Sequence, residues 1–129
     1  MPLVRLSRLA GRSATENRSL LDAAHNALVE AFRIPQHDRH QQLIELDSDH
    51  FEIPADRGDA FTLVEITAYP GRSAAAKRAL YQALARRFED VGIAPRDLFV
   101  VINEPPLENW SVRDGVSSAD VKPSFKLDV

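Results

Sequence analysis

The sequence contains two similar segments about 60 residues apart, and this internal repeat restricts the fold more than any other feature. Three pairs of segments match in chain order, at offsets of 60, 60 and 59 residues: 63–67 with 3–7, 71–73 with 11–13, and 93–104 with 34–45. One match of this length carries little weight, but three in order at nearly constant spacing indicate a duplicated structural unit. The chain is therefore predicted to fold as two copies of one unit.

The first unit has the pattern of a strand, a helix and a second strand. Residues 3–9 read as a strand, and Ser13 with Glu16 three positions later forms a capping box, which predicts the start of a helix. Apolar residues then recur at helical spacing, and the helix is expected to end before Pro35. Residues 40–46 read as the second strand, so the unit is β-α-β.

The second unit follows the same pattern after a polar connection over residues 47–60. Residues 63–67 read as a strand, and the helix after residues 71–73 is expected to be capped by Gly92. Each unit joins parallel strands by a right-handed helical crossover. The prediction is an α+β fold, built from α/β-type units, in which two tandem β-α-β repeats form a four-stranded sheet with two helices on one face.

These segments divide the whole chain. We expect one domain over residues 1–129, with repeat one at about 2–46, repeat two at about 61–104 and a C-terminal tail over 105–129. A chain of 129 residues with 44% apolar residues is long enough to bury one core.

The strand over residues 63–67 carries apolar side chains on both of its faces. Val64 and Ile66 alternate with Leu63 and Thr67, and two helices can cover only one face of the sheet. The second face is therefore expected to pack against other subunits, which predicts a homo-oligomer.

The tail begins with Pro105 and Pro106, which prevent the last strand from continuing. It contains Trp110, the only tryptophan of the chain. Residues 124–129 alternate in polarity, and we expect a short final strand there that pairs with a neighbouring subunit.

Composition excludes several classes of partner. The formal net charge is −3, which argues against nucleic-acid binding, and no apolar run approaches the roughly 18 residues of a membrane span. Cysteine is absent, and His37, His40 and His50 lack a metal-ligand spacing, so neither a metal nor another cofactor is expected. We expect a cytoplasmic protein.

Pro2 follows the initiator methionine directly. Because methionine is normally removed before a small residue, we expect Pro2 to carry a free secondary amine on a rigid ring. The ordinary pKa of an α-amino group is only about 7.7–8.0, so modest burial or a nearby cation would bring this amine close to neutrality. Such an amine can transfer protons at the working pH. The alternative is an ordinary proline at the start of a strand.

Several motifs together resemble the tautomerase superfamily: Pro2, the doubled β-α-β unit, Asp38, Gly71-Arg72-Ser73 and Asn109-Trp110-Ser111. The branch most similar to this chain contains malonate semialdehyde decarboxylase and its uncharacterised tautomerase-like relatives. The resemblance covers nearly the whole chain. It implies a trimer in which the amino-terminal proline of each subunit lies in a pocket at the subunit interface.

The resemblance also implies roles for individual residues. Pro2 matches the catalytic proline, Asp38 an acidic pocket residue, and Arg72 one of two arginines that bind the substrate carboxylate. Trp110 matches a pocket tryptophan. The second arginine falls on Pro70, and a family phenylalanine falls on Val112, so this sequence departs from the decarboxylase pattern at two positions.

Each of these residues also has a structural interpretation. Arg72 could be a solvated turn arginine like its repeat equivalent Arg12, and Asp38 a loop residue like Asp97. Trp110 could anchor the tail. Arg57 could supply a second cation that compensates for Pro70, although an exposed loop arginine is the simpler interpretation.

Three functions follow, in order of preference. The first is a cofactor-free tautomerase of small 2-oxo acids, with Pro2 as general base and Arg72 binding the carboxylate. The second is a decarboxylase-like lyase or hydratase, in which Pro2 is a cationic acid whose charge Asp38 favours. The third is a non-catalytic oligomeric module that binds a small carboxylate. The sequence does not decide whether Asp38 or Arg72 lies nearer to the amine.

Overall fold

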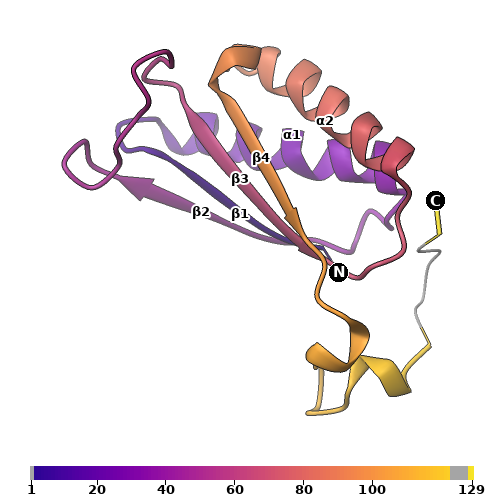
Figure 1. The fold of residues 1–129 in the computed structure, drawn as a ribbon. Helices are drawn as coiled ribbons and strands as arrows, with labels where there is room; N and C mark the ends of the chain where they lie inside the picture. Colours follow the sequence, from indigo (N-terminus) through magenta and orange to yellow (C-terminus); the bar gives the residue numbers. More distant parts are fainter. Residues whose placement is uncertain (1, 123–127) are drawn as a thin grey trace.

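The two repeats form one continuous sheet. The structure is a computed structural model that describes residues 2–122 and 128–129. Repeat one contains β1 (Pro2–Leu9), α1 (Ala14–Phe32) and β2 (His40–Leu46), and repeat two contains β3 (Thr62–Ala68), α2 (Ala74–Glu89) and β4 (Leu98–Asn103). The strands lie in the order β2-β1-β3-β4, with both helices on one face of the sheet (Figure 1). The predicted architecture is confirmed, whereas most of the strand expected over 124–129 lies outside the described residues.

The strand directions place equivalent parts of the two repeats at opposite ends of the sheet. Strands are parallel within each repeat, as predicted, but β1 and β3 pair antiparallel, with Pro2 opposite Ala68 and Ser7 opposite Leu63. The sheet therefore has a Pro2 end, where β1 and β2 start and β3 and β4 stop, and a Thr62 end, where the reverse holds.

The helix ends follow the local chemistry of the sequence. The Ser13 side chain accepts a hydrogen bond from the Glu16 backbone, and the Glu16 carboxylate accepts one from the Ser13 backbone, which confirms the capping box. Beyond α2, Gly92 has a positive φ of 89°, and the Ile93 backbone donates to the Phe88 carbonyl at 2.9 Å. This turn is the glycine cap that the sequence predicted.

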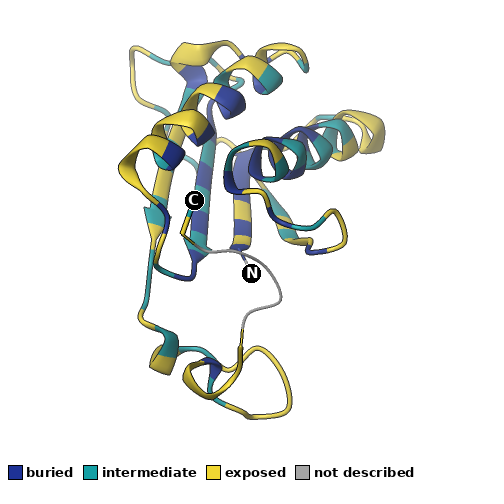
Figure 2. Ribbon diagram, turned by 90° about the vertical axis from the view of Figure 1, so that its right-hand side faces the viewer, coloured by how far each residue is buried: buried dark blue, intermediate teal, exposed yellow. Residues whose placement is uncertain are grey.

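The core lies between the sheet and the two helices. Alternate residues of the central strands, including Val4, Leu6, Val64 and Ile66, are buried against the helices (Figure 2). The inner faces of α1 and α2 contribute a set of fully buried apolar side chains: Leu20, Leu28, Phe32, Leu80, Leu84 and Phe88. Among the residues described, no helix combines the length and the apolar character that spanning a membrane requires.

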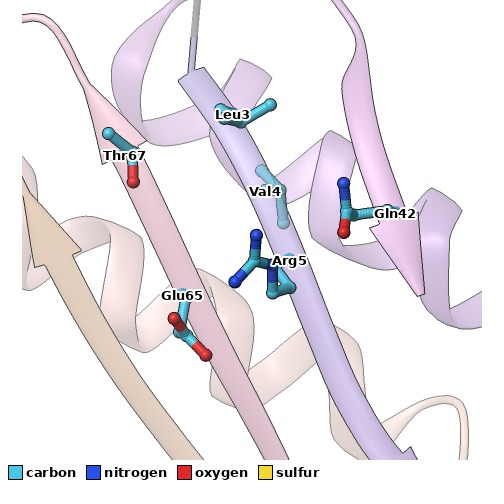
Figure 3. A pocket seen from close by; sticks show the side chains of 6 residues that line it. All are labelled: Leu3, Val4, Arg5, Gln42, Glu65 and Thr67. Atoms are coloured by element: carbon cyan, nitrogen blue, oxygen red, sulfur yellow. The ribbon is translucent and has the colours of Figure 1, made fainter. Parts of the chain in front are cut away.

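The opposite face of the sheet is uncovered within the chain. Leu3, Phe99 and Val101 on this face are 47%, 47% and 37% exposed. A shallow hollow of about 90 Å³ opens between β1 and its neighbours, where Arg5 extends toward Glu65 on β3 (Figure 3). The prediction that both faces of the sheet carry apolar side chains is confirmed.

Candidate active site

Pro2 is the first residue of β1 and is buried. It lies opposite Ala68, and it has the same parity along β1 as Val4 and Leu6, so it faces the helix side of the sheet. A proline is tolerated at the first position of a strand because its missing N–H costs no ladder hydrogen bond there. The Pro2 nitrogen is thus fixed at the rim of the core, beside the small side chain of Ala68.

Arg72 lies in the turn that joins β3 to α2 and is only 5% exposed. Its Nη1 donates to the Tyr69 carbonyl at 3.2 Å, and its Cζ lies 4.8 Å from the centroid of the Phe32 ring, a cation–π contact. Burial lowers the pKa of the Arg72 guanidinium, while the negative charges of Glu104 and Asp38 raise it. Arg72 is therefore a buried cation, on which the charges of two carboxylates act, rather than a solvated turn residue.

Asp38 lies in the loop between α1 and β2, and it is only 7% exposed. Its backbone N–H donates to the Pro35 carbonyl at 3.0 Å, and its Oδ1 lies 3.6 Å from Nε2 of His40, a residue near the start of β2. Because its charge acts on Arg72, Asp38 belongs to the same end of the sheet. The structure thus brings Pro2, Asp38 and Arg72 together at the Pro2 end.

A buried histidine fixes the loop that carries Asp38. His25 on α1 is 2% exposed, and its Nε2 lies 2.9 Å from the Gln36 carbonyl oxygen. The His25 ring therefore ties the loop to the helix.

Trp110 anchors the tail against the end of β3. Its indole N–H donates to the Pro105 carbonyl at 3.0 Å, and its ring packs edge-on against Tyr69 with centroids 5.0 Å apart. The Tyr69 hydroxyl in turn lies 2.8 Å from the Ser118 hydroxyl in a buried pair. These contacts hold the tail beside the residue that follows β3, at the Pro2 end.

Arg57 is not brought to this group within one chain. It lies at the Thr62 end, where its Nη1 donates to the carbonyl of Leu98, the first residue of β4, at 3.3 Å. Its Cζ lies 5.3 Å from the Phe61 ring centroid. The expectation that Arg57 compensates for Pro70 is not supported within one chain, because the sheet separates the two residues.

The Pro2 end also contains an ion pair that the sequence did not predict. Lys77 Nζ on α2 lies 2.5 Å from Oε1 of Glu104, directly after β4, and the two side chains are 28% and 23% exposed. The only sequence signal was the repeat match of Glu104 with Glu45, which gave no hint of a partner 27 residues away. Within the described part of the chain, no three metal-ligating side chains gather.

The chain matches a known protein family and a curated relative. The family described as "Tautomerase enzyme" matches residues 38–113, a segment that contains Asp38, Arg72 and Trp110. A curated relative, the probable tautomerase YrdN of Bacillus subtilis strain 168, is 38% identical over 118 residues, covering 86% of this chain and 90% of that protein. The chain belongs to the tautomerase family.

Solved structures agree with this membership and with the confirmed fold. A malonate semialdehyde decarboxylase is 32% identical with a TM-score of 0.82, over 88% of this chain and 92% of that one. A fused 4-OT described as a symmetric trimer shares the fold with a TM-score of 0.80 at 24% identity, over 91% of this chain and 96% of that one. The resemblance inferred from sequence motifs, including the decarboxylase-like branch of the tautomerase family, is confirmed.

Proposed function

We propose that the chain is a cofactor-free tautomerase of small 2-oxo acids, with the Pro2 amine as general base and Arg72 as the carboxylate ligand. The observation that carries this proposal is the shared position of a buried Pro2 and a buried arginine at one end of the sheet, on a tautomerase-family fold. A guanidinium binds a carboxylate through two parallel hydrogen bonds, which fixes the orientation of a small acid.

The reaction moves one proton between oxygen and carbon. With the preceding methionine removed, the neutral Pro2 amine takes the proton from the enol hydroxyl and becomes a prolinium. The prolinium then gives a proton to the carbon of the double bond while the carbonyl forms, which regenerates the free amine. Arg72 holds the carboxylate throughout, so the reacting atoms stay aligned with the rigid ring nitrogen.

Burial, rather than the balance of local charges, favours the basic form of the amine. Two cations, Arg72 and Lys77, and two carboxylates, Asp38 and Glu104, meet at the Pro2 end, so their effects on the amine oppose one another. Burial remains, and it disfavours an ammonium ion. We therefore expect the pKa of the Pro2 amine to lie below the ordinary α-amino value of about 7.7–8.0.

Replacing the proline tests the proposal. In Pro2→Ala, kcat for ketonisation of phenylenolpyruvate, followed by ultraviolet absorbance, is expected to fall by roughly 10²–10⁴-fold, the usual contribution of a positioned acid–base group. Pro54→Ala, an exposed proline in the loop between β2 and β3, is the matched control and should retain full turnover. Unchanged turnover in Pro2→Ala would remove the role of Pro2 and favour the non-catalytic binding module.

A decarboxylase or hydratase is the second candidate, because the buried Asp38 carboxylate lies at the same end and a decarboxylase relative has the same fold. A 3-oxo acid that loses carbon dioxide develops negative charge on its carbonyl oxygen, and a cationic Pro2 would stabilise this charge. Titrating the ¹⁵N resonance of Pro2 separates the candidates. A pKa below the ordinary value supports the base, and a pKa well above it supports the cationic acid.

We propose that the enzyme assembles as a homotrimer through the uncovered sheet face. Leu3, Phe99 and Val101 expose apolar surface there, and the fused 4-OT relative is a symmetric trimer of the same fold. Phe99→Glu would place a charge in this interface, so light scattering should show a loss of trimer. Tyr81→Glu, at an exposed apolar residue on α2, should keep the trimer and serves as the control.

A further inference from the structure

We propose that Lys77 and Glu104 form a specificity-determining pair for the substrate carboxylate. Lys77 holds the Glu104 carboxylate away from Arg72, so that one carboxylate of an oxo acid binds Arg72 and a second carboxylate is rejected. The inference rests on the proposed function, because it assumes that Arg72 is the ligand of the carboxylate.

The two residues reach the Pro2 end from different elements. The backbone N–H of Lys77 donates to the Ser73 carbonyl at 3.1 Å, so Lys77 lies in the first turns of α2, just after the turn that carries Arg72. Glu104 directly follows Asn103, which pairs with Thr67 of β3. Their 2.5 Å ion pair therefore connects the start of the helix to the end of β4.

The charge of Glu104 also acts on the Arg72 cation, although Glu104 forms its ion pair with Lys77. Burial lowers the pKa of Arg72, and the negative charges of Glu104 and Asp38 oppose this shift, with Glu104 having the larger effect of the two. A substrate carboxylate that binds Arg72 must approach this negative charge. Repulsion between like charges is strong in a partly buried site, where the effective dielectric constant is well below that of water.

The charge balance explains the role of the lysine. Arg72, Lys77, Asp38 and Glu104 sum to zero, so one bound carboxylate leaves the group at −1. Without Lys77 the same complex would carry −2, and Glu104 would be left to pair with Arg72 in competition with the substrate. A dicarboxylate also reaches −2 with the pair intact, which is the physical reason for its rejection.

Affinity measurements test the pair directly. Binding of pyruvate and of 2-oxoglutarate is followed by fluorescence of Trp110, the only tryptophan, and checked by calorimetry. Lys77→Met is expected to weaken pyruvate binding by about two- to fivefold, the range of a partly exposed charge pair. Glu104→Gln is expected to tighten it by a few fold and to raise the affinity for 2-oxoglutarate more strongly.

Two further variants separate this role from a general loss of positive charge. Lys77→Arg keeps the charge and should bind pyruvate as the unaltered protein does. Arg78→Met removes an exposed cation from the neighbouring position of α2 and should leave the affinity unchanged. In the double variant Lys77→Met/Glu104→Gln, the loss caused by Lys77→Met should be reversed, because the competing carboxylate is gone.

The outcomes are distinct from those of the catalytic test. Equal pyruvate affinity in Lys77→Met and the unaltered protein would overturn the inference, as would weaker binding in Glu104→Gln or no binding of pyruvate at all. A failure of the proposed chemistry appears instead as turnover retained in Pro2→Ala. Glu104→Gln replaces one carboxylate oxygen by an NH2 group and removes the charge with little change of shape. It therefore tests the pair even if Lys77→Met does not fold.

Discussion

The two ends of the sheet are built from equivalent positions of the repeat, yet they differ in what their polar residues contact. At the Thr62 end, the Asp97 carboxylate accepts a hydrogen bond from the Gly58 backbone at 2.7 Å, and the Thr62 hydroxyl donates to the Ala60 carbonyl at 2.9 Å. At the Pro2 end, Asp38 is buried and its negative charge instead acts on the Arg72 guanidinium. The aspartate at the Thr62 end holds a loop by a hydrogen bond, whereas the aspartate at the Pro2 end interacts with a buried cation.

The two ends also differ in the side chain that lies across from the first residue of the repeat's first strand, which is Pro2 in β1 and Thr62 in β3. Pro2 lies opposite Ala68, whereas the pairing of Ser7 with Leu63 places Arg8 beside Thr62. Arg8 is 3% exposed, and its Nη1 lies 3.3 Å from the Asn17 side-chain oxygen. The Thr62 end thus has a long buried arginine at the position where the Pro2 end has a small buried alanine. Two copies of one backbone unit therefore carry different buried side chains at equivalent positions.

The largest difference in activity should come from substituting the equivalent arginines, Arg72 and Arg12, one at a time. Arg72→Lys, which keeps the charge but loses the two-pronged donor geometry, is expected to lower kcat/KM for a 2-oxo acid by about tenfold, and Arg72→Ala by about a hundredfold. Arg12→Ala at the Thr62 end should leave kcat/KM unchanged, because this side chain is partly exposed to solvent. Equal losses in Arg72→Ala and Arg12→Ala, measured by steady-state kinetics, would contradict the difference between the ends.

Substitutions of the equivalent aspartates, Asp97 and Asp38, should affect stability and turnover to different degrees. Asp97→Ala leaves the Gly58 N–H without its acceptor, so the free energy of unfolding in urea is expected to fall by about 1–3 kcal/mol while turnover is retained. Asp38→Asn should instead change turnover with a smaller change in stability. A loss of turnover in Asp97→Ala without destabilisation would show that the Thr62 end also has a catalytic role.

The smallest effect concerns the helix starts, where the repeats also differ. Hydrogen bonds from the Ser13 backbone and side chain hold the pKa of Glu16 below its ordinary value near 4.5, whereas α2 has Ala76 at the matching position. A lowered carboxyl pKa contributes stability above the unfolded pKa, and this contribution is lost as the pH falls through the folded value. Urea unfolding between pH 7 and pH 3 should therefore be less pH-dependent in Glu16→Gln. The same pH dependence in Glu16→Gln and the unaltered protein would show that the Ser13–Glu16 capping box makes no measurable contribution to stability.

Local signals in the sequence predicted most of the fold. The repeat, the capping box and Gly92 indicated the strands and both helix ends, because each depends on residues close together in the chain. The antiparallel pairing of β1 with β3 was not predicted, since neither repeat contains information about how the other docks. For the same reason the sequence left open whether Arg57 compensates for Pro70, although the sheet holds the two residues at opposite ends. The Lys77–Glu104 pair was missed because its members lie on separate elements.

The fusion of two repeats in one chain has a consequence for how such a chain can evolve. A duplicated gene copies every side chain, so a site made of side chains arises twice and either copy can be kept. An α-amine is different, because a polypeptide has only one, and the second copy of the unit begins with Thr62 inside an amide bond. In the proposed chemistry, fusion of two units therefore halves the number of reactive amines per unit. The Thr62 end is then released from selection for catalysis and can be reshaped for stability alone.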